Sequence, residues 1–455
     1  MAEETRSLAA WAASLTLDQV PADMRAIAVD LLVDQIGIQI GCSHLPWAQA
    51  VRDTYRSAGG EAEATTVRYG DRLPVASVTF INSVFGHSFE YDDANPLIHG
   101  HIGGELVPPL LALSEREHLT GAAFLTSLVT GYEVRGRVGW AVSPTMLERG
   151  GPQYSTTCGP FGTAAAVGKL LEFGADGIHN ALAVAGTFSG GLMQYDQGGG
   201  SVKRLFTAVA AIGGLQAAML AKAGITGPEG ILEGARGLLR IYPESYNPER
   251  LTSDLGGMWT LQHVLFKPYC CCAIIHPAID ATRNILDRHS IGPDEIKSIE
   301  VGYPKGSHHH AAITDPKDIL GMQFSTAFSL ASTVLTGKNT PAAYTMDAIH
   351  DPSMRAMASR VSLTNDKDLD DLFVGHMPAR VTIQTLSGAE HTELVVDAKG
   401  SPAKRLTSAE VDEKFRSMVV DVLGQERTEE LINTLRHIVD APDMAQIAKL
   451  LVKKR

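Results

Sequence analysis

The stretch that decides the fold is Gly186–Gly237, which reads GTFSGGLMQYDQGGGSVKRLFTAVAAIGGLQAAMLAKAGITGPEGILEGARG. It passes from small residues through a polar turn and three glycines to two adjacent cations, Lys203 and Arg204. Residues 205–221 are apolar on nearly every helical face, which predicts a helix buried on all sides. Glycine loops and helix N-termini present backbone N–H groups to anions. We therefore expect an anion site here; the alternative interpretation is a flexible turn with two solvated cations.

The size and composition are those of an ordinary globular protein, and they limit the kinds of partner that it can bind. The 455 residues are enough for two or three domains, and 44% of them are hydrophobic. The net charge of -12 provides no basic field for nucleic acid or an anionic membrane, so any anion site must be local. The N-terminal residues lack the pattern of a signal peptide, and no apolar window is long and uninterrupted enough to predict a transmembrane helix. We expect a cytoplasmic protein.

The cysteines and clustered histidines do not predict a disulfide framework or a metal site. There are five cysteines, three of them consecutive at Cys270–Cys272, and an odd count agrees with a reduced compartment. Structural zinc sites space their cysteines by two to four residues, which this triplet does not do. The consecutive histidines His308–His310 are interpreted as a polar loop. The sequence therefore predicts no metal.

Helical periodicity dominates the first 265 residues. In 22–42, for example, Met24, Ile27 and Leu31 fall on one apolar face. Residues 64–69 are expected to form a short exposed excursion. Helices are predicted at 5–20, 22–42, 47–58, 74–89, 107–117, 121–142, 160–172, 176–187, 203–223 and 228–234.

The pattern changes near residue 265. Ile296–Tyr303 alternates like a strand, and Arg380–Leu386 with Glu390–Asp397 is typical of a hairpin. We predict a mainly α protein with a large all-helical domain, residues 1–265 with 403–455, and a smaller inserted α+β domain, residues 266–402. The last helices should pack on the first domain. Helices are predicted at 276–288, 323–335, 342–349, 352–358, 408–422, 426–437 and 442–452.

Five short polar groups lie in predicted loops or at helix ends, where functional residues concentrate. Each also has an ordinary structural interpretation as a cap, a turn or a solvated face. Together they offer a general base, two lysines and hydroxyl groups, a set that suits proton transfer beside a small polycarboxylate. The groups are Glu90 to Asp93; His99 with His101; Gln153 to Gly159; Lys203 with Arg204; and Lys267 to Cys272 with His276.

Several stretches, taken in order, resemble one known family from end to end. They are Leu32–Gly41, Phe80–Asp93, Val107–Glu115, Thr157–Leu171, Gly199–Gly237, Lys267–Ala281, Gln323–Ser325 and Ala409–Phe415. The chain resembles the MmgE/PrpD family, which includes 2-methylcitrate dehydratase, cis-aconitate decarboxylase and iminodisuccinate epimerase. The resemblance implies a helical domain and an α+β lid with the site in the cleft between them. It also implies a homodimer that works without a metal or an organic cofactor.

The resemblance carries over to some site residues and not to others. His101, Lys203 and Lys267 match the family's loop histidine and its two lysines. Methylcitrate dehydration is disfavoured, because a dehydratase must protonate its leaving hydroxyl and donors are missing here. The departures are Glu90 for an aspartate, Ala94 for a threonine, Gln153 and Phe206 for histidines, Cys272 for a polar residue that is often histidine, and Phe328 for a tyrosine.

We therefore expect a cofactor-independent lyase, either a dehydratase or a decarboxylase, acting on a small di- or tricarboxylate. Lys203 and Lys267 would hold carboxylates, while His101 and Asp93 would transfer protons. An epimerase or isomerase remains an alternative, as does a non-catalytic relative that binds a metabolite. The expected partners are a carboxylate substrate and a second copy of the chain, with no nucleic acid and no membrane. The further substrate-binding candidates are Glu90, Asp92, His99, Gln153, Tyr154, Arg204, Cys272 and His276.

Overall fold

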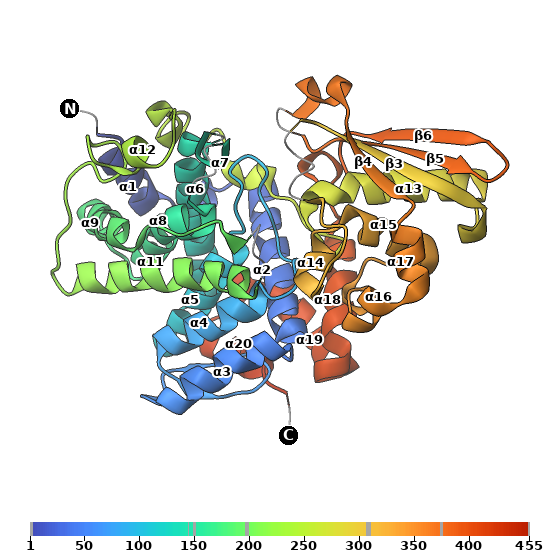
Figure 1. The fold of residues 1–455 in the computed structure, drawn as a ribbon. Helices are drawn as coiled ribbons and strands as arrows, with labels where there is room; N and C mark the ends of the chain where they lie inside the picture. Colours follow the sequence, from blue (N-terminus) through green and yellow to red (C-terminus); the bar gives the residue numbers. More distant parts are fainter. Residues whose placement is uncertain are drawn as a thin grey trace.

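The computed structural model describes residues 3–143, 145–148, 152–195, 200–305, 311–373 and 376–453. A helical body occupies one side of the molecule, and a part containing a sheet occupies the other (Figure 1). The protein is mainly α, as the sequence predicts. The histidine run His308–His310 lies outside the described residues.

The helical body is built from the first 265 residues. Its longer helices cross one another around a common core, and α2 runs through the middle of the body (Figure 1). The helices are α1 (Glu4–Ser14), α2 (Ala22–Cys42), α3 (Pro46–Ala58), α4 (Val75–Gly86), α5 (Gly103–Arg116), α6 (Gly121–Val142), α7 (Thr145–Glu148), α8 (Tyr154–Leu170), α9 (Ala175–Ala185), α11 (Phe206–Lys222) and α12 (Leu238–Ile241).

Helix α11 packs closely on α8 but is not buried on all sides, so that prediction is wrong. A Cβ added at Gly214 would lie 2.4 Å from the Cβ of Thr163, so the missing side chain permits the close approach. On the outer face, Val209 is 38% and Leu220 is 40% exposed. The segment Val202–Lys222 is long and apolar enough to cross a membrane by length and composition only, and half of it is buried in the protein, as in a core helix.

The C-terminal helices pack on the helical body, as predicted. They are α18 (Ser408–Leu423), α19 (Gln425–Arg436) and α20 (Met444–Leu450). Lys414 of α18 forms a buried ion pair of 2.7 Å with Asp34 of α2, and Arg436 of α19 pairs with Asp30. The chain thus returns to its first long helix after the sheet is complete (Figure 1).

The remaining part contains a four-stranded sheet in the order β4-β3-β5-β6. Its β3 (Ile296–Tyr303) pairs antiparallel with β5 (Ala379–Thr385), and β5 forms a hairpin with β6 (Glu390–Val395). The sequence analysis missed β4 (Val361–Asn365), which runs parallel to β3 with Ile299 opposite Val361. One face of the sheet packs on α13, and the apolar residues of β3 and β5 point towards it. The helices are α13 (His276–His289), α14 (Ile319–Gln323), α15 (Thr326–Thr336), α16 (Met346–His350) and α17 (Pro352–Ala358).

Several predicted boundaries in the helical body are wrong. Residues 228–234 form turns instead of a helix. Residues 64–69 are largely buried and contribute β1 (Ala64–Thr65), which pairs with β2 (Arg72–Leu73). Helix α5 begins four residues before its predicted start at 107, and α8 begins six residues before 160. Both helices contain proline after the first turn. Proline in a sequence predicts a helix break, but tertiary packing overrides that preference here.

The chain crosses from the helical body to the α+β part twice, at neighbouring places. Ala94 and Leu265 exchange backbone hydrogen bonds of 3.0 and 2.7 Å. The N–H of Phe266 donates to the carbonyl of Gly400 at 2.9 Å. Gly400 has a φ of +87°, and a Cβ there would lie 1.9 Å from the Phe266 oxygen, so only glycine fits this crossing.

Candidate active site

The centre of the site is an acidic loop, residues 87–95, which follows α4. Glu90 has a φ of +52°, in the left-handed region that non-glycine residues rarely adopt. Side chains from four separate segments hold this backbone in place. Four consecutive carbonyls accept hydrogen bonds: Ser88 from Arg204 at 2.7 Å, Phe89 from Gln323 at 2.6 Å, Glu90 from Lys267 at 3.2 Å and Tyr91 from Lys414 at 2.8 Å.

The two predicted lysines meet at one carboxylate, that of Glu90. Lys203 pairs with Oε1 of Glu90, and the Nζ of Lys267 lies 3.3 Å from Oε2. Lys203 lies in a 3₁₀ turn (Val202–Leu205) that leads into α11, and Lys267 lies just past the crossing at Leu265. All three side chains are buried. Two segments far apart in the sequence therefore place two ammonium groups at one carboxylate of the protein.

The charges at this point stabilise one another. Burial opposes ionisation of Glu90, but Lys203 and Lys267 outweigh it and hold the pKa of Glu90 well below its ordinary value. Burial also opposes the charge on Lys267, but Glu90 and Asp92 raise its pKa overall. Glu90 and Lys267 are therefore both charged at neutral pH, although they are almost completely enclosed.

Asp92 is shared by two histidines. Its Oδ2 lies 2.7 Å from Nδ1 of His87 and 3.3 Å from Nδ1 of His101. The His101 Nδ1 also lies 2.9 Å from the carbonyl of Asp93, a contact that requires a proton on that nitrogen. The Nε2 of His101 is therefore the nitrogen left to exchange a proton with a ligand.

Burial and neighbouring charges set the ionisation of this group. Burial raises the pKa of Asp92, but His87 and His101 overcome it and bring the pKa well below its ordinary value. Burial lowers the pKa of His101, and Lys203 and Lys267 act in the same direction, while Asp92 opposes them. His101 is therefore predominantly neutral at pH 7. Its side chain is 19% exposed, more than the neighbouring charged side chains.

Asp93 is turned into the helical body. Its Oδ1 accepts from the N–H of Gly103 at 3.0 Å, and its Oδ2 accepts from the hydroxyl of Tyr132 at 2.7 Å. Burial and the adjacent Asp92 raise the pKa of Asp93 to about 7. Asp93 thus fastens the acidic loop to the start of α5, and both of its oxygens are already engaged in the protein.

The next three substrate-binding candidates serve local structure. Arg204 lies over the ring of Trp47 at 3.8 Å while it holds the Ser88 carbonyl. Gln153 caps α8 by accepting from the N–H of Thr156 at 2.9 Å. His99 lies against the ring of Tyr154, with ring centres 5.6 Å apart.

Cys272 and His276 lie on the α+β side of the same region. The N–H of Cys272 donates to the carbonyl of Gln323 at 2.9 Å, and burial raises the pKa of its thiol. His276 is fully buried against Tyr269, with its Nε2 3.3 Å from the Cys271 carbonyl. Burial lowers the pKa of His276 to about 3, so this imidazole is neutral.

Sequence reasoning missed four residues that shape the site. His87 and Tyr132 hold Asp92 and Asp93, while Gln323 and Lys414 hold the backbone of the acidic loop. His87 sits five residues before Asp92, a spacing that a search for histidine–carboxylate pairs can find. Lys414 lies in Ala409–Phe415, one of the stretches that carry the family resemblance, but its amphipathic helical pattern does not mark it as a site residue.

One group among the described residues has the donors of a metal site. His87, Asp92 and His101 each place one such atom within 4.8 Å of the others. The Nδ1 atoms of both histidines already lie within hydrogen-bond distance of the Asp92 Oδ2, and Nδ1 of His101 carries a proton. A metal on these nitrogens would have to displace those protons, because a metal ligand must be deprotonated.

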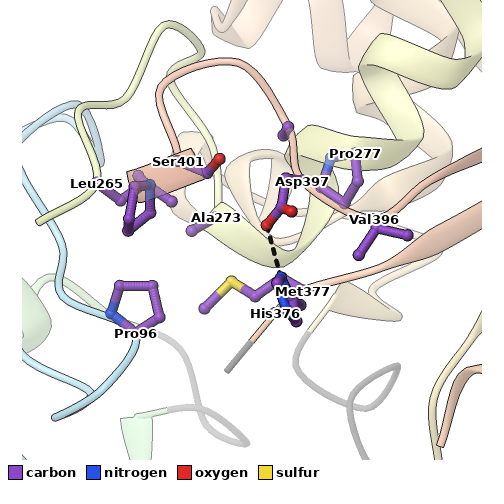
Figure 2. A pocket seen from close by; sticks show the side chains of 11 residues that line it. Pro96, Leu265, Ala273, Pro277, His376, Met377, Val396, Asp397 and Ser401 are labelled. Carbon is purple, nitrogen blue, oxygen red and sulfur yellow. Dashed lines mark hydrogen bonds and ion pairs between the residues drawn. The ribbon is translucent and has the colours of Figure 1, made fainter. Parts of the chain in front are cut away.

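Two hollows among the described residues are lined by neither Lys203 nor Lys267. The first, about 20 Å³, lies where Pro96 and Leu265 approach the paired side chains of His376 and Asp397 (Figure 2). It has room for roughly one water molecule. The second, about 540 Å³, lies between Arg72, Glu115 and the C-terminal segment. Neither is lined by a predicted site residue.

Comparison with known proteins establishes the family. The MmgE/PrpD N-terminal domain matches residues 6–251, and the MmgE/PrpD C-terminal domain matches residues 269–437. The chain belongs to the MmgE/PrpD family. The match to the C-terminal domain extends past the predicted boundary at 402 and includes the whole of α18 and α19.

Three relatives show how far the likeness extends. A cis-aconitate decarboxylase-like protein, oryM, from Aspergillus oryzae is 27% identical over 98% of this chain and 97% of its own length. A cis-aconitate decarboxylase from Aspergillus terreus is 24% identical over 98% of this chain and 95% of its own length. The human cis-aconitate decarboxylase is 27% identical over 84% of this chain and 80% of its own length. At family level these likenesses support an enzyme of the lyase class.

Proposed function

We propose that this protein is a lyase that decarboxylates a small unsaturated acid with two or three carboxylates, with dehydration as the second possibility. The observation that carries the proposal is the meeting of Lys203 and Lys267 at one buried carboxylate beside His101. Two ammonium groups fixed at one point are a receptor for carboxylate oxygen. The names of the three relatives support decarboxylation as the reaction.

The geometry suggests how each group would act. The lysines would anchor a carboxylate that remains in the product and stabilise negative charge as it spreads towards that group. The bond from carbon to the departing carboxylate breaks, carbon dioxide leaves, and the electron pair stays on the substrate carbon. The Nε2 of a protonated His101 would deliver the proton to that carbon, and the Asp92 carboxylate would stabilise the imidazolium.

Decarboxylation needs fewer proton-transfer groups than the alternatives. A dehydratase must remove one proton and supply another to its leaving hydroxyl, and an epimerase needs a group on each face of one carbon. Hydrogen bonds orient the ring of His101, and its side chain is more exposed than those of the charged residues beside it. One oriented histidine, acting in its protonated form, is sufficient to protonate a carbanion.

The test is a panel of small carboxylic acids that includes cis-aconitate, citrate and their two-carboxylate analogues. Carbon dioxide release, loss of a hydroxyl group and exchange of substrate hydrogen in D₂O are followed in parallel. Carbon dioxide release with any acid supports the proposal, and hydrogen exchange without product supports an epimerase. A rise in melting temperature with no chemistry would indicate a binding protein, because a ligand that binds only the folded state stabilises it.

The remaining expectations from the sequence are proposals of the same kind. We propose that the reaction needs no metal, so dialysis against EDTA should leave activity and melting temperature unchanged. We also propose that residues 266–402 act as a lid hinged at the two crossings, and that the protein is a cytoplasmic homodimer. The exposed apolar side chains Val209 and Leu220 of α11 support an association surface. Light scattering at several concentrations tests the dimer.

A further inference from the structure

His87 is the more enclosed of the two histidines that contact Asp92. Its side chain is 1% exposed, whereas that of His101 is 19% exposed. The backbone N–H of His87 closes the last turn of α4 by donating to the carbonyl of Ser83 at 3.1 Å. The ring of His87 is therefore carried by the end of a helix and is less accessible to a substrate than that of His101. We expect His87 to act on the reaction through its neighbours.

The two histidines share one oxygen of Asp92. Its Oδ2 lies 2.7 Å from Nδ1 of His87 and 3.3 Å from Nδ1 of His101. Since an ionised carboxylate only accepts hydrogen bonds, Nδ1 of His87 carries the proton that it donates. The other oxygen, Oδ1, is buried and has no hydrogen-bond partner among the described residues. His87 thus has the closer contact with the oxygen that His101 also needs.

This sharing makes it harder for His101 to hold a second proton. A nearby negative charge stabilises a protonated imidazole, and a hydrogen bond to that negative charge weakens its effect on other groups. A neutral His87 weakens the attraction between Asp92 and His101, because it donates to the shared oxygen. A protonated His87 also repels a protonated His101, whose ring centre lies 4.9 Å away. In both ionisation states His87 opposes protonation of His101 at Nε2.

Other charged groups also face these rings. Lys203 and Lys267 oppose a second proton on His101, as burial does. Burial raises the pKa values of Asp93 and Glu105 to about 7, so both titrate in the same range as a histidine. A comparison between His87 variants is therefore more informative than the pH profile of one protein. The charged or titratable groups around the two rings are Glu90, Asp92 and Asp93 of the acidic loop, Lys203 and Arg204 before α11, Lys267, Asp34 and Cys42 of α2, Glu105 of α5, Tyr132 of α6 and Lys414 of α18.

We propose that His87 is a positioning residue that competes with His101 for the Asp92 carboxylate and so sets the pH range in which His101 can donate a proton. This inference rests on the proposed function. Without His87, the whole charge of Asp92 would act on His101, which would then keep its proton to a higher pH. Because the protonated ring is the donor, the fall in activity with rising pH would move in the same direction.

The test is the pH titration of the His101 ring in the full-length wild type and in two His87 variants. Carbon-13 labelling of histidine makes the rings visible by NMR, and the His101 signal is assigned by its loss in His101→Asn. His87→Leu removes the donor, so the His101 midpoint should rise by about one pH unit, the order expected for a charge-assisted hydrogen bond. His87→Asn keeps an N–H donor bonded to Cγ, as Nδ1 is in histidine, and should leave the midpoint near that of the wild type.

A surface histidine provides the matched control. Nδ1 of His376 lies 2.8 Å from Oδ1 of Asp397, and its side chain is 43% exposed. His376→Leu therefore breaks a histidine–aspartate pair of the same kind and should not move the His101 midpoint. If His87→Leu does not fold, His87→Gln takes its place, because it moves the amide one methylene away from Asp92. The pH dependence of kcat/KM is measured for the same proteins.

The outcomes separate the inference from the function on which it rests. A His101 midpoint that is unchanged or lower without the His87 donor, or that rises equally in His87→Asn, overturns the inference and leaves the lyase proposal standing. A raised midpoint that moves the fall in kcat/KM with it supports the inference, and a raised midpoint that does not move kcat/KM overturns it. If no acid of the panel is turned over, the proposed function fails, while the ring titration still decides whether His87 competes for Asp92.

Discussion

The acidic loop and the β5–β6 hairpin are held in place by different kinds of interaction. The hairpin is fixed by its neighbours in sequence: Thr382 faces Thr392 across the ladder, with their hydroxyls 2.9 Å apart, and Gly388 takes a φ of +90° in the turn. The loop is fixed by donors between 116 and 323 positions away in sequence. The hairpin can form early, whereas the loop requires contacts of high sequence separation and their loop-closure entropy.

The difference shows where the site is vulnerable. Substitutions in the hairpin should act locally, because its partners lie within the same short segment. Substitutions far from the acidic loop should change it directly, because its backbone is held by side chains from other segments. Four predictions test this contrast, in order of the effect expected.

The largest effect is expected for Lys414→Met in α18. This change removes the donor to the Tyr91 carbonyl and leaves the buried carboxylate of Asp34 without its ion-pair partner. The free energy of unfolding should fall by about 3–5 kcal/mol, which is typical of breaking a buried pair. Denaturant unfolding measures this loss, and kcat/KM should also fall at temperatures where the variant is fully folded.

The control for Lys414→Met is Glu413→Gln, one residue earlier on the exposed side of the same helix. It should change neither stability nor activity. Burial raises the pKa of Asp34 even beside Lys414, so Asp34 can take up a proton at low pH when the lysine is absent. The loss of stability should therefore be smaller at pH 5 than at pH 8. A Lys414→Met protein with wild-type stability would show that the distant contact does not hold the loop.

The second prediction concerns Lys203→Met and Lys267→Met, tested separately. Each change removes one charge-assisted contact, typically worth ~1.5–3 kcal/mol, so kcat/KM should fall roughly 10–150-fold. Both lysines are buried with Glu90, so each change should also reduce stability. The melting temperature should also fall, although less than for Lys414→Met, since one lysine still pairs with Glu90.

Lys222→Met is the matched control for the lysine pair, because Lys222 is an exposed lysine at the opposite end of α11. It should behave like the wild type in both measurements. Full activity in a folded Lys203→Met or Lys267→Met variant would remove that lysine from the site.

The third prediction is a pH dependence of kcat/KM, which reports on ionisations of the free enzyme. Burial lowers the pKa of His101, and only its protonated form can donate to a carbanion. Activity should therefore fall as the pH rises through that lowered pKa. If His101 acted as a base, as in an epimerase, activity would rise over the same range.

In this experiment, the titration of His101 must be distinguished from the titration of two nearby acids. Asp92 stays ionised over the whole range, because its pKa is held well below the ordinary value. Asp93 titrates near 7, so the profile is repeated with Asp93→Asn. A change in kcat/KM with pH that remains in Asp93→Asn but is absent in His101→Asn is due to the ionisation of His101. A profile that does not change in His101→Asn would exclude His101 as the proton donor.

The smallest effect is expected in the hairpin. Thr382→Val replaces one hydroxyl of the Thr382–Thr392 pair with a methyl group and keeps the branched shape that strands favour. The free energy of unfolding should change by about 0.5 kcal/mol or less, and kcat/KM should not change. A loss of activity here would mean that the sheet is coupled to the acidic loop and that the contrast between the two regions is wrong.

Features with a local cause were predictable from the sequence. The strand Ile296–Tyr303 and the hairpin after it follow the period-two pattern, and most helices of the body follow the helical period. The helix predicted at 228–234 was wrong, because a stretch punctuated by glycines can satisfy its backbone in turns. The edge strand β4 was missed because its exposed pattern is weak without β3 beside it.

The sequence by itself determined the fold class, the family and the residue types at the site, because periodicity and ordered motifs are properties of neighbouring residues. It also indicated Lys203 and Lys267 as the residues that would hold carboxylates. Only the tertiary structure showed that the two lysines contact Glu90. The position of Glu90 depends on hydrogen bonds from Gln323 and Lys414 to the acidic loop. Both residues are far from the loop along the chain, so the sequence alone does not reveal these hydrogen bonds. Asp93 and Gln153 likewise became structural anchors through the helix ends that they reach, Gly103 and Thr156. The ionisation states of the buried acids at this site could not be predicted from the sequence either, because burial and charges nearby in space set their pKa values.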